Sequence, residues 1–208
     1  MVAETFTSLA SRYTESIPLV EKLYTELVKH YSEKGRFYHN LDHLNFLLQQ
    51  ILPLADLIKD LDMVLFAVYY HDVVYSVLRK DNEEKSTLFA EKRLNTLNVK
   101  TNRIERCNKH ILATKAHQVS DDSDTNFFTD ADLAVLGQDW SAYKIYTEGV
   151  RKEYWIYPDI IYKPGRRKVV EHFLRMDKIY KTEPFFVKFE NRARLNLKRE
   201  LEELANGI

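Results

Sequence analysis

Residues 55–72 read ADLIKDLDMVLFAVYYHD, and this stretch decides the fold class. Its second half is apolar on every side of a helix, which is typical of a helix that ends at the centre of a protein. The run then closes on His71 and Asp72, two titratable groups in a position that the pattern assigns to the core. A buried carboxylate without a partner costs several kcal/mol, so the pair needs a physical reason.

The rest of the chain has the apolar spacing of amphipathic helices and few helix breakers, with five Gly and five Pro in 208 residues. It predicts an all-α protein, a helical bundle that forms one domain over residues 1–208. We expect helices over about 4–31, 39–52, 55–72, 81–97, 102–117, 129–137, 139–156, 166–180 and 184–205. Asp81 and Glu84 have the spacing of a capping box. Residues 157–165, YPDIIYKPG, form the longest stretch that we expect to be irregular.

Composition limits the classes of function. The chain has 31 Lys and Arg against 31 Asp and Glu, a formal net charge of zero, so no binding to a nucleic-acid polymer is expected. Cys107 is the single cysteine, which excludes an internal disulfide and suits a reducing cytoplasm. No apolar run approaches the ~20 residues of a membrane span. We therefore expect a cytoplasmic protein without a membrane partner.

Three segments combine histidine or aspartate with apolar surroundings: YHNLDHL (38–44), HD (71–72) and TDADLAVLG (129–137). His39 and His43 are four residues apart, so on a helix they would share one face. A metal ion lying between the directions of His71 and Asp72 would explain their burial, because a cation keeps a ligating carboxylate ionised. Mixed imidazole and carboxylate ligands favour a divalent Mn, Fe, Co, Ni or Zn ion.

These motifs and their order resemble the HD-domain superfamily of metal-dependent phosphohydrolases. YHNLDH is similar to the first metal motif of the cyclic nucleotide phosphodiesterase branch. The series RFYHNLDHL, YYHDVVY, NEEKS, ILATKAH, DADLAVLG and VRKEY, over about residues 36–200, most resembles a small group of stand-alone predicted phosphohydrolases. The resemblance implies four metal ligands, which are His43, His71, Asp72 and Asp132. It leaves His39 as a catalytic group beside Asp72.

Two ligand alternatives stay open: His39 in place of His43, and Asp130 in place of Asp132. The resemblance implies hydrolysis of a phosphate ester or phosphoanhydride by metal-activated water, with a nucleotide or another small phosphorylated metabolite as substrate. It does not imply cyclic nucleotide hydrolysis, because the chain has no counterpart of the purine-clamping glutamine pocket. A phosphate needs fixed cations, and the candidate substrate contacts are Lys115, His117 and Arg151.

Other interpretations compete with the hydrolase. His71 and Asp72 can be a buried hydrogen-bonded pair without a metal. His110 and His117 lie in the interval where HD-type folds with two irons carry extra histidines, which makes a di-iron oxygenase the second hypothesis. The third is a non-catalytic helical module that binds a nucleotide or a partner protein and keeps a structural metal. The sequence leaves open the substrate, the metal, the number of ions and the oligomeric state, a homodimer included.

Overall fold

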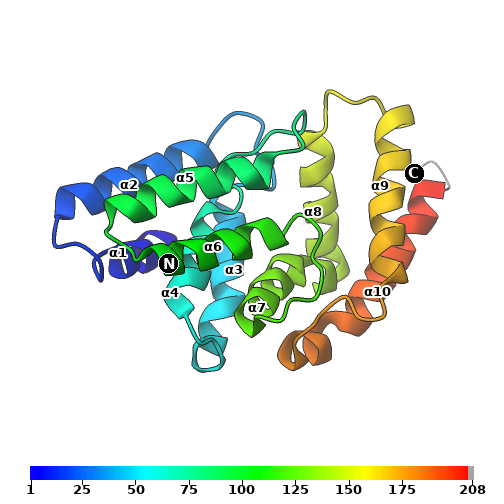
Figure 1. Cartoon of the computed structure of the whole chain (residues 1–208). Helices are drawn as coiled ribbons and strands as arrows, with labels where there is room; N and C mark the ends of the chain where they lie inside the picture. The colour runs from blue at the N-terminus through cyan, green and yellow to red at the C-terminus, as the bar shows by residue number, and fades with distance from the viewer. Residues whose placement is uncertain (206–208) are drawn as a thin grey trace. The chain divides into compact units, whose positions relative to one another are not determined.

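The computed structural model describes residues 1–205, and every regular element in that range is helical (Figure 1). The all-α prediction is confirmed. The elements are α1 Val2–Ala10, α2 Ile17–Tyr31, α3 Leu41–Ile51, η1 Leu52–Leu57, α4 Leu61–Tyr70, α5 Asn82–Thr96, α6 Thr101–Ala113, α7 Ser123–Leu133, η2 Ala134–Gly137, α8 Trp140–Glu153, α9 Asp159–Arg175 and α10 Glu183–Ala205. Within the described residues, no helix combines the length and the apolar character that a membrane crossing requires.

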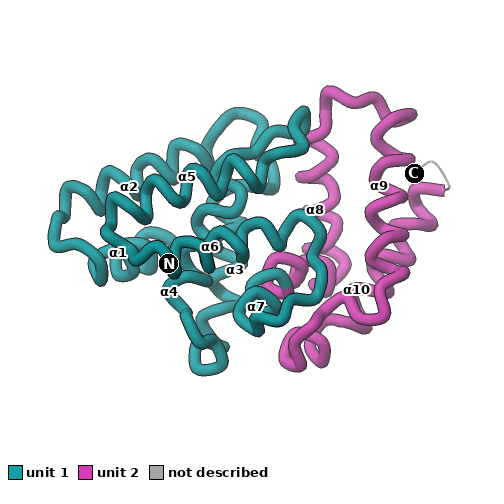
Figure 2. Tube along the Cα trace, viewed as in Figure 1, with its two compact units in different colours: residues 1–129 teal, residues 130–208 magenta. Residues whose placement is uncertain are grey.

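The chain divides into two compact units, residues 1–129 and residues 130–208 (Figure 2). The boundary falls inside α7, so that one continuous helix begins in the first unit and ends in the second. The single domain that we expected from the sequence stays a prediction.

Helix α4 is the centre of the first unit. Every residue from Met63 to Tyr70 is buried, and helices α1, α3, α5 and α6 all pack against α4. The helix begins at the N-cap residue Asp60, whose side chain accepts a hydrogen bond from the Met63 amide at 3.3 Å. The apolar run therefore ends in the core, as its composition predicted.

A partly buried network of charges around Asp124 joins the beginnings of α4 and α7 to α6. Asp124 is fully buried in the first turn of α7. Its carboxylate accepts hydrogen bonds from the backbone amides of Lys59 at 3.0 Å and Asp60 at 2.8 Å. Arg106 of α6 donates to the same carboxylate at 2.9 Å, and Arg103 donates to Asp60 at 3.0 Å. Buried charges are stable only when paired in this way, so the network specifies how the three helices meet.

Helix α10 organises the second unit, where it packs against α9 and η2. The side-chain amide of Asn196 donates to the carbonyls of Leu136 and Gln138, both at 2.8 Å, and thereby ties η2 to α10. Arg166 of α9 pairs with Glu200 at 2.7 Å, and both side chains are buried. The carboxylate of Glu200 thus satisfies a cation that α9 buries, which fixes these two helices together.

Several local expectations were wrong, including the helix over 55–72, which begins only at Leu61, and the helix over 129–137, which begins at Ser123 as α7 and ends as the 3-10 helix η2. The expected helix 4–31 is two helices, because residues 11–16 are polar and Pro18 lies in the first turn of α2, where a missing amide costs nothing. The expected irregular stretch 157–165 belongs largely to α9, which begins at Asp159 and contains Pro164. Asp81 is the N-cap of α5 without a side-chain capping bond; its carboxylate lies 3.5 Å from the Lys85 ammonium, and Glu84 pairs with Lys115.

Two groups on α6 are buried away from solvent. The Cys107 thiol is fully buried, and burial raises its pKa well above the ordinary range. The His110 ring is also fully buried, and its Nδ1 lies 2.8 Å from the Thr125 hydroxyl of α7. Burial lowers the pKa of His110 to about 4, so this ring is neutral at physiological pH.

The contact between η2 and α10 predicts the effect of a methyl group at Gly137. A Cβ there would lie 2.5 Å from the Cβ of Phe189 and 2.8 Å from its carbonyl oxygen. We expect Gly137→Ala to lower the free energy of unfolding by about 1–3 kcal/mol, measured by denaturant titration. The matched control is Gly165→Ala inside α9, where nothing lies within 4 Å and alanine should stabilise the helix by up to about 1 kcal/mol. Equal effects of the two changes would contradict this packing.

Burial of His110 predicts a dependence of stability on pH. The pKa of this histidine is about 6.5 in the unfolded chain and about 4 in the folded chain. Between these two pH values the unfolded chain is therefore protonated at His110 and the folded chain is not. The contribution of His110 to the free energy of unfolding should be constant above pH 6.5. It should then fall by about 3 kcal/mol as the pH falls from 6.5 towards 4. His110→Asn should remove this part of the slope, whereas His172→Asn, at an exposed site on α9, should leave it unchanged.

Candidate metal centre

The first motif is positioned by the beginning of α3. The Asn40 side chain is the N-cap and accepts the backbone amides of Asp42 at 2.9 Å and His43 at 3.3 Å. His43 therefore lies in the first turn, with its side chain buried, and His39 lies just before the helix. The expectation that both histidines share one helical face was wrong, but their ring centroids are still only 5.7 Å apart.

The second motif is positioned by the end of α4. His71 is the C-cap residue, and its Nδ1 lies 2.9 Å from the carbonyl oxygen of Val68. A carbonyl only accepts, so Nδ1 carries the proton, and the Nε2 of the neutral ring has a lone pair for a cation. Asp72 follows in the turn after the helix, and its carboxylate comes back to within 3.1 Å of that Nε2.

Four side chains of the first unit converge at this point. The Nε2 atoms of His43 and His71 are 3.1 Å apart. The Oδ2 atom of Asp72 is 3.1 Å from the Nε2 of His71 and 3.9 Å from those of His39 and His43. A first-row metal with bonds of about 2.1 Å at an angle near 95° separates its ligand atoms by about 3.1 Å. The spacing of the two ring nitrogens, and of Asp72 and His71, fits such an ion.

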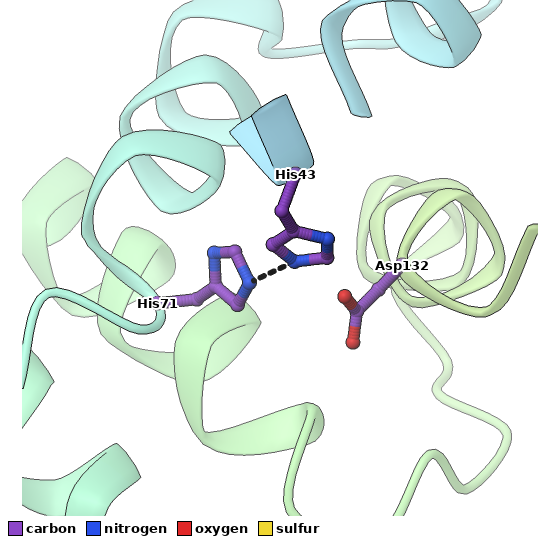
Figure 3. A group of neighbouring side chains, drawn as sticks. All are labelled: His43, His71 and Asp132. Atoms are coloured by element: carbon purple, nitrogen blue, oxygen red, sulfur yellow. Dashed lines mark hydrogen bonds between the residues drawn. The ribbon is translucent and has the colours of Figure 1, made fainter. Parts of the chain in front are cut away.

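Asp132 adds a second carboxylate. It lies in the last turn of α7 and is drawn together with His43 and His71 in Figure 3. One ligand atom from each of His43, His71 and Asp132 lies within 4.8 Å of the others, so these three residues can hold a metal ion. Such a set of imidazole nitrogens and carboxylate oxygens has the donor chemistry that first-row divalent metals prefer.

The electrostatics around Asp72 suit a ligand. Burial acts to raise the pKa of this carboxyl, but the positive charge that His71, His39 and His43 carry when protonated, together with a hydrogen bond from His71, outweighs that effect and holds the pKa well below its usual range. Asp72 is therefore ionised at neutral pH. The side chains of Asp72 and His39 are 17% and 20% exposed, against 1% for His43 and His71, so the first two can meet a molecule that arrives from solvent.

Asp130, the alternative to Asp132, has a structural role in the second unit. Its carboxylate accepts the amides of Lys181 at 2.9 Å and Thr182 at 2.7 Å, together with the Thr182 hydroxyl at 2.8 Å. The Lys181 ammonium lies 3.3 Å away, and the Asp130 side chain is fully buried. These bonds anchor the segment before α10 on α7.

Two of the three predicted substrate contacts, Lys115 and Arg151, have other partners. Lys115 donates to the Lys80 carbonyl at 3.0 Å and pairs with Glu84. Arg151 pairs with Asp159 at 2.7 Å and donates to two carbonyls at the end of α8. His117 has a φ of 51° as the chain leaves α6. As contacts to a substrate, Lys115, His117 and Arg151 stay predictions.

Two neighbours of the site were missed by the sequence analysis. Arg36 donates to the carbonyls of His39 and Asp72, and the Tyr75 ring lies against the His39 ring with centroids 4.2 Å apart. No regular spacing signals either contact, because bonds to backbone carbonyls are not encoded by a residue pattern. The only available signal was the proximity of both residues to the histidine motifs.

Comparisons with known protein families, with curated proteins and with solved structures found no match for this chain.

The different surroundings of the two aspartates predict different effects of mutation. Asp132→Asn should weaken Mn²⁺ or Co²⁺ binding at least about 100-fold, because even partners of metal ligands contribute 10–100-fold. Thermal stability of the metal-free protein should change little. Asp130→Asn should lower the free energy of unfolding by about 1–3 kcal/mol, because it disturbs a buried set of hydrogen bonds. Calorimetric metal titration and thermal unfolding separate the two, and equal loss of affinity in both variants would contradict this assignment.

Proposed function

We propose that the protein is a metal-dependent phosphohydrolase. It would cleave a phosphate ester or phosphoanhydride of a nucleotide or another small phosphorylated metabolite. The observation that supports this most is the convergence of His39, His43 and His71 on the carboxylate of Asp72. Such a mixed donor set is the chemistry of first-row divalent metals. The resemblance to the HD-domain superfamily points to the same reaction.

The roles of the residues follow from their exposure. His43, His71, Asp72 and Asp132 would hold a divalent Mn, Fe, Co, Ni or Zn ion. When bound, the cation would lower the pKa of a water molecule and withdraw charge from a phosphoryl oxygen. Asp72, whose side chain is 17% exposed, would accept a hydrogen bond from the attacking water and orient it towards phosphorus.

His39 would serve as the general acid. It lies outside α3, partly exposed, and Tyr75 and Tyr38 hold its ring on two sides, with centroids at 4.2 Å and 4.9 Å. As the water oxygen bonds to phosphorus and the bond to the leaving oxygen breaks, the imidazolium would give its proton to that leaving oxygen. The proton lost by the water would then recharge the imidazole, so the cycle closes without another reactant.

The general-acid role predicts a dependence on the leaving group. His39→Gln should lower kcat by about 10²–10⁴-fold for an alkyl phosphate or nucleotide substrate, whose leaving oxygen needs a proton. The loss should be much smaller for p-nitrophenyl phosphate, whose leaving group departs as an anion. Phosphate release in the presence of Mn²⁺ measures both. The control is His30→Gln, a histidine of α2 that pairs with Glu33, and it should keep full activity.

A screen of nucleotides and sugar phosphates with each candidate metal tests the proposal as a whole. Asp72→Asn should abolish turnover while circular dichroism shows an intact helical fold. Substrate binding without turnover under every metal would reject the hydrolase and favour the non-catalytic module. Iron-dependent uptake of dioxygen, with no phosphate released, would favour the di-iron oxygenase.

A further inference from the structure

Arg36 connects the two segments that carry the site. Its Nη1 donates to the carbonyl of His39 at 3.1 Å and to the carbonyl of Asp72 at 2.7 Å. Its Nη2 donates to the carbonyl of Val73 at 3.0 Å. One guanidinium therefore holds the chain before α3 against the turn after α4, at the backbone of both partly exposed site residues.

The same guanidinium lies between two aromatic rings that touch the site. It is 5.0 Å from the ring centroid of Tyr31 and 5.5 Å from that of Tyr75. The hydroxyl oxygen of Tyr31 accepts the backbone amide of Asp72 at 3.3 Å, and the ring of Tyr75 lies against His39. Asp72 is thus held on its amide side by Tyr31 and on its carbonyl side by Arg36.

The chemistry of these contacts explains why an arginine suits this position. All three acceptors are backbone carbonyls, so the guanidinium fixes Asp72 without drawing its carboxylate away from the imidazoles. A planar group with five donors can serve several carbonyls and stack on rings at the same time, whereas the compact ammonium of lysine cannot do both.

We propose that Arg36 is a positioning residue of the metal centre. It does not bind the ion; it holds the backbone of His39 and Asp72 so that their side chains meet the buried rings of His43 and His71. Groups that orient metal ligands contribute to metal affinity although they do not touch the metal. This inference rests on the metal centre of the proposed function, but not on the identity of the substrate.

The test is a Co²⁺ titration of the full-length chain, followed by visible absorption of the bound ion. Arg36→Ala should bind Co²⁺ about 10–100-fold more weakly than the unchanged chain and with an altered spectrum. Arg36→Lys should recover only part of the affinity. Methylguanidinium in the medium should restore both affinity and spectrum to Arg36→Ala, whereas methylammonium at the same concentration should not.

The matched control is Arg93→Ala. Arg93 also joins two helices of the first unit, since it pairs with Glu26 at 2.5 Å and lies 3.7 Å from the ring centroid of Phe89. Its removal should lower thermal stability and leave Co²⁺ affinity, spectrum and the response to methylguanidinium unchanged. Loss of affinity in both variants would mean that Arg36 acts through general stability alone, which would overturn the proposal.

The remaining outcomes are also decisive. Unchanged Co²⁺ affinity in a folded Arg36→Ala overturns the inference, and if that variant does not fold, unchanged affinity and spectrum in Arg36→Lys does so. An unaltered chain that binds no Co²⁺ rejects the metal centre and with it the proposed function. An unaltered chain that binds Co²⁺ but hydrolyses no phosphate rejects the hydrolase alone, and the effect of Arg36 on affinity still decides the inference.

Discussion

The structure depends on one constraint: a helix buried on every side ends in two polar groups that have to be satisfied inside the protein. Each residue of α4 from Met63 onward is buried, so the His71 ring at its end is closed to water, while the Asp72 side chain keeps 17% of its surface exposed. The protein meets this constraint by bringing other polar groups to them. The Val68 carbonyl accepts a hydrogen bond from Nδ1 of His71, and the imidazoles of His39 and His43 lie near the Asp72 carboxylate. The Nε2 atoms of His43 and His71 lie 3.1 Å apart, and Asp72 Oδ2 lies 3.1 Å from the second of them, so several possible ligand atoms gather at one point.

Much of the fold could be predicted because hydrophobic periodicity reports burial directly. The all-helical class and the central position of α4 followed from apolar spacing alone. The positions where the helices begin and end could not be predicted in this way, because they depend on local contacts that apolar spacing does not reflect. Pro18 begins a helix rather than lying within one, and Pro164 lies inside α9 although such a residue usually stops a helix. The buried ion pair of Arg166 and Glu200 joins residues that are far apart in the sequence, so no local sequence pattern predicts it.

The candidate site could be predicted in its members but not in its geometry. His43, His71 and Asp132 were named from three short motifs, and their ligand atoms do lie close together. The reason given for the first motif was wrong, because Asn40 caps α3 and leaves His39 before the helix. That difference matters chemically. The His39 side chain is 20% exposed and the His43 side chain 1%, which separates a group that can meet a substrate from a buried ligand.

The burial of Cys107 has a practical consequence. Its thiol is enclosed on α6, and its raised pKa keeps it protonated, while only the thiolate reacts with alkylating reagents. Because it is the single cysteine of the chain, alkylation of the native protein should wait for an opening of the helices around it. The rate of labelling would therefore report directly how often the first unit opens, without any engineered probe.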